Sequence, residues 1–90
     1  MEVKISKKKA IELLANAKGV EVITFQGGAP SHRMAGIRLP KVVNSVGIQF
    51  FYPDASEGSW LRYADIEAAN ITLENDTDLN IGWATYRIYN

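Results

Sequence analysis

The chain has 90 residues, of which 47% are hydrophobic and 22% charged, with no cysteine and a formal net charge of zero. This composition excludes a disordered chain, and the lack of cysteine excludes disulfide bonds and thiolate metal sites, as is usual in a reducing compartment. No apolar run approaches the roughly 20 residues that span a bilayer, and no signal-peptide core follows Lys7-Lys8-Lys9. We therefore expect a single cytoplasmic domain over residues 1–90, without a membrane partner.

The first predicted element is a helix over residues 7–18. Ser6 is a suitable N-cap, and Gly19 stands where a left-handed C-terminal cap belongs. Four apolar residues follow the spacing of one helical face: Ala10, Leu13, Leu14 and Ala17. This apolar stripe is narrow, so we expect the helix to pack across a larger element.

Residues 20–73 predict five short antiparallel strands that form a small barrel. The expected strands are residues 20–26, 31–39, 48–52, 59–63 and 68–73. Gly27-Gly28-Ala29-Pro30 has strong turn chemistry, and a tight turn is expected around Ala64-Asp65-Ile66. Gly36 favours a bulge or bend, and Pro40 is expected to end the second strand.

Residues 74–90 predict a polar loop followed by one more strand. The loop, residues 74–80, is rich in Asn and Asp, and residues 81–89 then alternate between two faces. One face carries Trp83, Thr85, Arg87 and Tyr89, and the other carries Ala84, Tyr86 and Ile88. We expect this strand to be additional to the five-stranded barrel and to pair along its edge.

Several segments resemble a known family. KAIELLANAKG at residues 9–19, followed by Ile23-Thr24-Phe25 and Arg33-Met34, is similar to the opening of small phage-type proteins with an Sm-like or SH3-like β-barrel, the WYL-like group. SWLRYADIEA at residues 59–68 resembles the place where such proteins have a strand, a one-turn 3₁₀ segment and a closing strand. The resemblance implies a mainly β, α+β fold, with an N-terminal helix packed on an SH3-like antiparallel barrel. It implies no biochemical role, and residues 41–45 and the tail after Leu73 depart from the pattern.

Charge and aromatic content indicate binding rather than catalysis. Residues 1–45 hold eight Lys or Arg against three Asp or Glu, a net +5, and residues 46–90 hold two against seven, a net −5. The two halves either attract each other within the domain or form a surface with a basic and an acidic side. The aromatic residues either cover the open ends of the barrel or provide contacts for a partner.

Two sequence patterns suggest a catalytic or a metal-binding site, but each departs from what such a site requires. Ser31 and His32 suggest a nucleophile and a base, but adjacent strand residues point to opposite faces. Asp76, Asp78 and Asn80 have the spacing of a calcium loop, but the glycine comes one position late and position 12 is an arginine, so an Asx-rich hairpin loop is preferred. We expect no enzyme, no metal site and no cofactor.

The leading hypothesis is a non-catalytic, phage- or mobile-element-encoded protein that inhibits or modulates a host protein in the bacterial cytoplasm, as an anti-CRISPR or other anti-defence protein would. Its candidate contacts are aromatic and acidic residues that can mimic nucleic acid: Trp83, Tyr86, Tyr89, Asp76 and Asp78. The alternative is a nucleic-acid-binding Sm-like module that uses basic residues: Lys7, Lys8, Lys9, Arg33, Arg38 and Lys41. Homo-oligomerisation through a sheet edge is compatible with either.

Overall fold

The computed structural model describes residues 2–30, 36–54 and 57–90, apart from the side chains of residues 57, 59 and 68. In this part of the chain the elements, in order, are β1 (Glu2–Lys4), α1 (Lys7–Ala15), β2 (Gly19–Phe25), β3 (Ile37–Val43), β4 (Gly47–Phe51), β5 (Glu57–Arg62), the 3₁₀ turns η1 (Tyr63–Asp65) and η2 (Ala68–Asn70), β6 (Thr72–Glu74), β7 (Asp78–Asn80) and β8 (Ala84–Tyr89). The prediction of a mainly β fold with an N-terminal helix is confirmed. None of the described helices has the length or the apolarity that crossing a bilayer requires.

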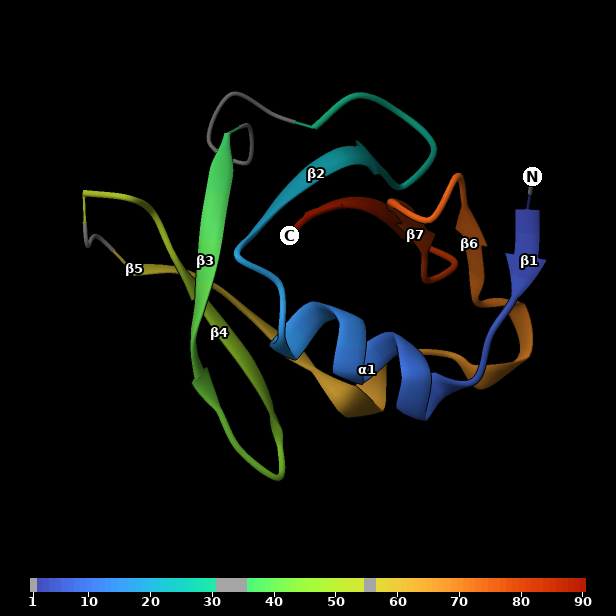
Figure 1. Ribbon diagram of the computed structural model, residues 1–90, viewed down its shortest axis with the longest axis horizontal. Coiled ribbons are helices and arrows are strands. Elements are labelled where there is room, and N and C mark those ends of the chain that lie inside the picture. The colour runs from blue at the N-terminus through green and yellow to red at the C-terminus, as the bar shows by residue number, and fades with distance from the viewer. Residues whose placement is uncertain (1, 31–35, 55–56) are drawn as a thin grey trace.

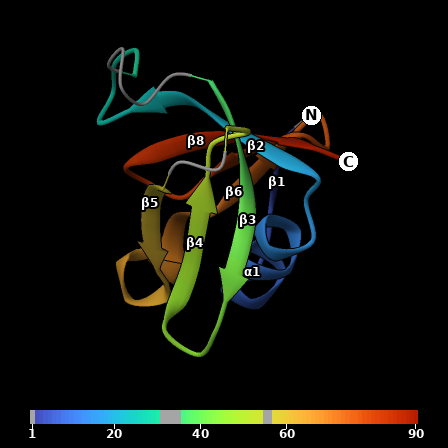
Figure 2. The same ribbon diagram turned by 90° about the vertical axis from the view of Figure 1, so that its left-hand side faces the viewer.

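The strands form one antiparallel sheet in the order β1-β6-β7-β8-β2-β3-β4-β5 (Figure 1). Among the described residues, β2 and β3 pair at two positions, Val20 with Arg38 and Glu21 with Ile37, and the sheet turns sharply between them (Figure 2). We call β1-β6-β7-β8-β2 sub-sheet A and β3-β4-β5 sub-sheet B. The sheet ends in β1 on one side and β5 on the other, so the predicted five-stranded barrel is not confirmed.

The position predicted for the last strand is wrong, although its alternation is confirmed. β8 pairs with β7 on one side and with β2 on the other, so it lies inside the sheet rather than at its edge. Ala84, Tyr86 and Ile88 point into the core. The strand begins later than predicted, since Gly82 has φ +100° in the turn between β7 and β8.

The predicted start of the helix is confirmed, but its end is three residues too late. The Ser6 Oγ accepts a hydrogen bond from the backbone N–H of Lys9 at 3.1 Å, as an N-cap should. α1 ends at Ala15, and Asn16 is its C-cap: the Asn16 N–H makes the last helical hydrogen bond to the carbonyl of Glu12 at 3.0 Å, and the Asn16 Nδ2 donates to the same carbonyl at 2.9 Å.

Gly19 is the first residue of β2, not a left-handed cap, because the chain joins the sheet at this point. The N–H of the preceding Lys18 donates to the carbonyl of Tyr89 at 2.8 Å, and Gly19 itself lies opposite Tyr89 in the ladder. A Cβ at position 19 would lie 2.9 Å from the Ile37 Cγ2, so glycine permits β3 to approach β2 closely.

Two expectations for the second strand change. Pro40 does not end β3 but lies within it, at a register shift between Pro40 and Val42 where the pairing with β4 is irregular. A bulge tolerates proline because a ladder N–H is not required there. Gly36, at φ +101°, precedes β3, and residues 31–35 of the predicted strand lie outside the described residues.

The first half of the fifth predicted strand is a 3₁₀ turn, η2, and the short strand β6 follows it. The tight turn expected just before it is present as η1, where the N–H of Ile66 donates to the carbonyl of Tyr63 at 3.1 Å. β6 and β7 form the Asx-rich hairpin, since Asn75 and Asp76 have φ of 53° and 63° and suit a turn that requires positive φ.

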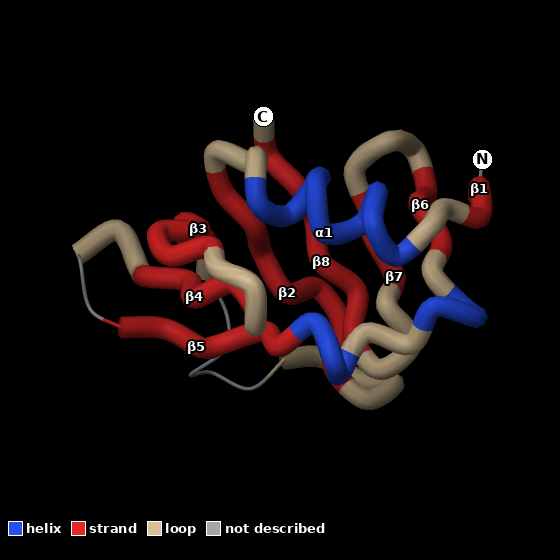
Figure 3. The backbone as a smooth tube through the Cα atoms, turned by 90° about the horizontal axis from the view of Figure 1, so that it is seen from below, coloured by secondary structure: helices blue, strands red, loops and turns tan. Residues whose placement is uncertain are grey.

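A single hydrophobic core joins the helix to both sub-sheets. α1 lies across the concave side of the sheet, beneath β2 and β8 in Figure 1 and in front of them in Figure 3. The buried hydrophobic residues are Ala10, Leu14, Ala17, Val20, Val22, Ile48, Phe50, Leu61, Ile66, Ile71, Leu79, Ile81, Ala84, Tyr86 and Ile88. Because α1 covers this concave side, a partner cannot reach the concave face of the sheet directly and would meet the outer faces, the edges or the exposed side of α1.

Candidate functional site

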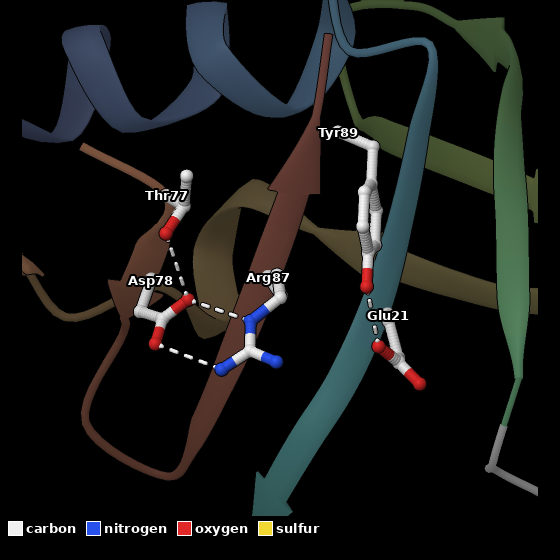
Figure 4. A network of polar contacts seen from close by, with 5 residues as sticks. All are labelled: Glu21, Thr77, Asp78, Arg87 and Tyr89. Carbon is white, nitrogen blue, oxygen red and sulfur yellow. Dashed lines mark hydrogen bonds and ion pairs between the residues drawn. The ribbon is translucent and has the colours of Figure 1, made fainter. Parts of the chain in front are cut away.

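The acidic residue Asp78 is held by an ion pair within the sheet (Figure 4). Arg87, its neighbour on β8, donates from Nε to Oδ1 at 3.0 Å and from Nη2 to Oδ2 at 3.2 Å. The hydroxyl of Thr77 donates to Oδ1 at 3.1 Å, and the Arg87 hydrogen bond lowers the pKa of Asp78. Both carboxylate oxygens are thus engaged within the protein. The other acidic candidate, Asp76, is exposed in the β6–β7 turn.

Tyr89 connects β8 to β2 on the outer face of sub-sheet A. Its hydroxyl donates to the Glu21 Oε1 at 2.8 Å, and this hydrogen bond raises the pKa of Tyr89 (Figure 4). The side chain is still 38% exposed, so its ring remains accessible. Of the aromatic candidates in the tail, Tyr89 is the one that the structure leaves on the surface.

Tyr86 was predicted as a partner contact, and the structure places it in the core instead. It is 4% exposed, and its ring stacks on Phe50 with centroids 6.2 Å apart. Burial raises the pKa of Tyr86 to about 12. Trp83 is half-buried, makes edge contacts with Phe25 and Tyr86, and donates from Nε1 to the carbonyl of Asp65 at 2.9 Å. The predicted aromatic and acidic tail surface is therefore largely committed to holding the fold together.

The basic candidates do not form one patch. Lys8 and Lys9 are exposed and Lys7 is half-buried on the first turn of α1, which begins at the β1 and β6 end of the molecule (Figure 1). Lys41 is exposed on β3, and this strand lies beyond the C-terminal end of α1 in Figure 1. The strand that carries Lys41 is therefore at the other end of the helix from the three lysines.

Arg38 cannot serve as a surface contact for nucleic acid, because it is 2% exposed. Its Nη2 donates to the Tyr52 hydroxyl at 3.3 Å, and its Cζ lies 5.2 Å from the centre of the Tyr52 ring. This cation–π arrangement is favourable for a guanidinium in the interior. Arg33, the sixth basic candidate, lies outside the described residues, as do Ser31 and His32.

The structure shows an apolar surface on sub-sheet B that the sequence analysis missed. Among the described residues, five of the seven exposed large hydrophobic side chains lie on β3, β5 or the β3–β4 turn: Ile37, Val42, Val43, Val46 and Trp60. Val43 pairs with the buried Ile48, so it lies on the opposite face from Val42 and Trp60. Val42 and Trp60 flank Gln49 in register across the three strands, on the face opposite the buried Ile48 and Leu61. Figure 2 shows these strands side by side, with β4 in the middle.

A hollow of about 300 Å³ lies at one end of this surface, lined by Asn44, Val46, Trp60 and Arg62. The Asn44 Oδ1 accepts hydrogen bonds from the N–H groups of Val46 and Gly47, at 2.8 and 3.0 Å, and so fixes the turn. Val46 is 60% exposed and Trp60 is 45% exposed. The sequence signal was the presence of three valines at positions 42, 43 and 46 around an Asx turn, where polar residues are usual.

The described part of the chain shows no group of three or more His, Cys, Asp or Glu side chains placed to hold a metal ion. Comparison of the chain with family models, with curated proteins and with solved structures gave no match. The candidate site is therefore defined by its geometry alone. It consists of the exposed valines Val42 and Val46, the indole of Trp60, the guanidinium of Arg62 and the side-chain amide of Asn44.

Proposed function

We propose that this protein is a non-catalytic binding module that engages another protein through the outer face of sub-sheet B, centred on Trp60 and Val46. The observation that carries the proposal is the concentration of exposed apolar side chains on this sub-sheet. Contiguous exposed apolar surface on a small domain marks interaction sites, and exposed Trp is a frequent hot spot. The proposal keeps the expectation that the partner is a host protein and the chain a phage- or mobile-element-encoded inhibitor; that part rests on the sequence resemblance.

We also propose that β8-β2-β3-β4-β5 is the unit that corresponds to an SH3-like or Sm-like barrel. Its support is the sheet order, in which these five strands are neighbours and the last strand of the chain adjoins β2. In this description β6, β7 and β1 extend the sheet beyond the barrel unit. A structure in which β8 lies apart from β2 would contradict it.

The test is affinity capture from nuclease-treated bacterial lysate, using wild type, Trp60→Ala and Tyr89→Ala, with captured proteins identified by mass spectrometry and re-tested in purified form. Tyr89 is a matched control because it is a second exposed aromatic residue, on sub-sheet A. We expect one protein to bind wild type and Tyr89→Ala directly and to be lost with Trp60→Ala. Capture that survives Trp60→Ala, or no capture from any lysate, refutes the proposal.

Nucleic-acid binding remains the second candidate function, favoured by the exposed Lys8 and Lys9 at the start of α1. Its signature is an affinity that falls steeply with salt, because bound phosphates release counterions. The same capture without nuclease distinguishes the two. Recovery of nucleic acid that Lys8→Ala/Lys9→Ala abolishes, with Trp60→Ala unaffected, would favour this second candidate.

A further inference from the structure

The outer edge of β5 offers backbone groups for another strand. β5 is the last strand of the described sheet and pairs with β4 alone. The N–H of Tyr63 donates to the carbonyl of Val46, and the register runs without a shift from there to Trp60. In an antiparallel pair the direction of the backbone groups alternates, so Leu61 and Tyr63 bond to β4, while Trp60 and Arg62 present N–H and C=O to the open side.

The hollow beside this edge is rich in hydrogen-bond donors. In the described part of the chain no acidic group pairs with the Arg62 guanidinium, and the Trp60 Nε1–H has no acceptor. The Asn44 Oδ1 is used by two backbone amides, so the Nδ2 of Asn44 is the part of this amide that remains for a ligand. None of the described residues that line the hollow carries a carboxylate. Its chemistry is therefore complementary to an anionic acceptor with an apolar body.

The size of the hollow limits what can enter it. A volume of about 300 Å³ is at the lower end of the range for small-molecule pockets and suits one or two side chains. The walls formed by Val46 and Trp60 suit aliphatic carbons, and Arg62 suits a carboxylate. A glutamate or aspartate on an extended chain satisfies both requirements.

We infer that the hollow and the open edge of β5 together bind an extended acidic peptide segment of a partner protein, which pairs with Trp60 and Arg62 as an added strand and places one carboxylate against the Arg62 guanidinium. Such strand addition draws affinity from main-chain hydrogen bonds and specificity from pockets for alternate side chains. The inference rests on the proposed function, because it assigns the chemistry of the partner at that surface.

The experiment begins with a selection of random displayed peptides on the immobilised full chain. Binding of each enriched peptide is then titrated and compared with that of a variant peptide, its amide twin, in which every Asp is replaced by Asn and every Glu by Gln. We expect the enriched peptides to carry an acidic residue among β-branched residues. The amide twins, and the protein variant Arg62→Gln, should each weaken binding roughly tenfold or more. Lys41→Gln is the matched control, since it removes the same charge from sub-sheet B and should bind as wild type does.

Amide hydrogen exchange tests the strand pairing separately from the charge. The N–H groups of Trp60 and Arg62 should exchange quickly in the free protein and become protected when an enriched peptide is bound. Those of Leu61 and Tyr63 should already be protected by β4. A charge contact without strand addition would leave the Trp60 and Arg62 amides unprotected and overturn the inference.

The remaining outcomes are also decisive. Enrichment of peptides without acidic residues, equal binding by Arg62→Gln, or no enrichment at all overturns the inference. Dimerisation of the chain that Trp60→Ala abolishes, seen by sedimentation, would show a second copy in the site and overturn it as well. In each case capture of a protein that depends on Trp60 would still support the proposed function, so the two can fail independently.

Discussion

Replacement of Tyr86 gives the sharpest test of the fold. A tyrosine in this tail suggests a surface contact, whereas the structure places its side chain in the hydrophobic core. Tyr86 is 4% exposed, stacks on Phe50 and meets the edge of Trp83. At about 25 cal/mol per Å², removing roughly 150 Å² of buried ring and side-chain surface costs about 4 kcal/mol. This agrees with the range of about 3–5 kcal/mol seen when buried aromatic residues are truncated to alanine.

We therefore expect Tyr86→Ala to lower the free energy of unfolding by about 3–5 kcal/mol in urea titrations followed by circular dichroism. This loss is a large part of the stability of a small domain, and Tyr86→Ala could unfold completely. Tyr86→Phe and Tyr86→Leu are therefore measured as well, because they remove less buried surface. Tyr86→Phe keeps the ring and should cost less than about 1 kcal/mol, with Tyr86→Leu between the two. A loss within about 0.5 kcal/mol for Tyr86→Ala would place the ring on the surface and refute the reasoning.

The pH dependence provides an independent check on the same side chain. Burial raises the pKa of Tyr86 from 10.0 to about 12, so the folded state holds the proton more tightly than the unfolded state. The associated stability is fully present below pH 10 and is lost as pH rises toward the folded pKa, at about 1.4 kcal/mol per pH unit. Tyr86→Phe should remove this part of the alkaline loss, and an unchanged alkaline profile would contradict the burial of the hydroxyl.

Three further predictions concern local features. Ser6→Ala removes the oxygen that caps the Lys9 N–H and should cost about 1 kcal/mol in urea titrations, whereas Ser6→Asp should cost little. Arg87 lowers the folded pKa of Asp78, so their ion pair stabilises the protein above the unfolded value of 3.8 and loses this effect as pH falls through the folded pKa; Asp78→Asn should weaken the acid dependence of thermal melts. Gly47→Ala should destabilise the fold strongly, because a Cβ there would overlap a backbone carbonyl of β5; soluble yield and melting temperature check this.

Local signals in the sequence predicted local structure well, because the physical cause lies within a few residues. Ser6 caps the helix whatever the rest of the chain does, and Gly27 and Asn75 have the positive φ that their turn positions require. The alternation of the last strand is also visible in the sequence, since Ala84 and Ile88 share a face and both are buried. These features need no knowledge of which strands become neighbours.

Strand neighbours could not be predicted in the same way, because pairing joins residues far apart in the chain. β7 has only three residues, Asp78–Asn80, and reads as part of a polar loop, yet it places β8 inside the sheet. Arg38 looks like a surface cation, and nothing nearby in the sequence shows that Tyr52 lies against its guanidinium. The position of β8 and the burial of Arg38 both depend on tertiary contacts between distant residues, and the local sequence does not contain this information.

The misassignment of Tyr86 has a different cause, since the sequence held the correct information. Tyr86 alternates with Ala84 and Ile88, so it shares their face, and the face of a half-buried strand decides burial more than residue type does. The charged and polar residues Arg87 and Thr85 mark the other face as the outer one. Assigning aromatic residues by face would have placed Tyr86 in the core.

The same rule, applied to sub-sheet B, shows why its outer face requires a functional explanation. Ile48, Phe50 and Leu61 are the buried hydrophobic residues of β4 and β5 that belong to the core. The outer face could be polar without any loss to that core, as is common for antiparallel sheets with one side in water. It carries Val42 and Trp60 instead, and within the described residues no second layer covers them. They shield Gln49, which is buried between them, and under the proposed function a partner would in turn bury their exposed surface.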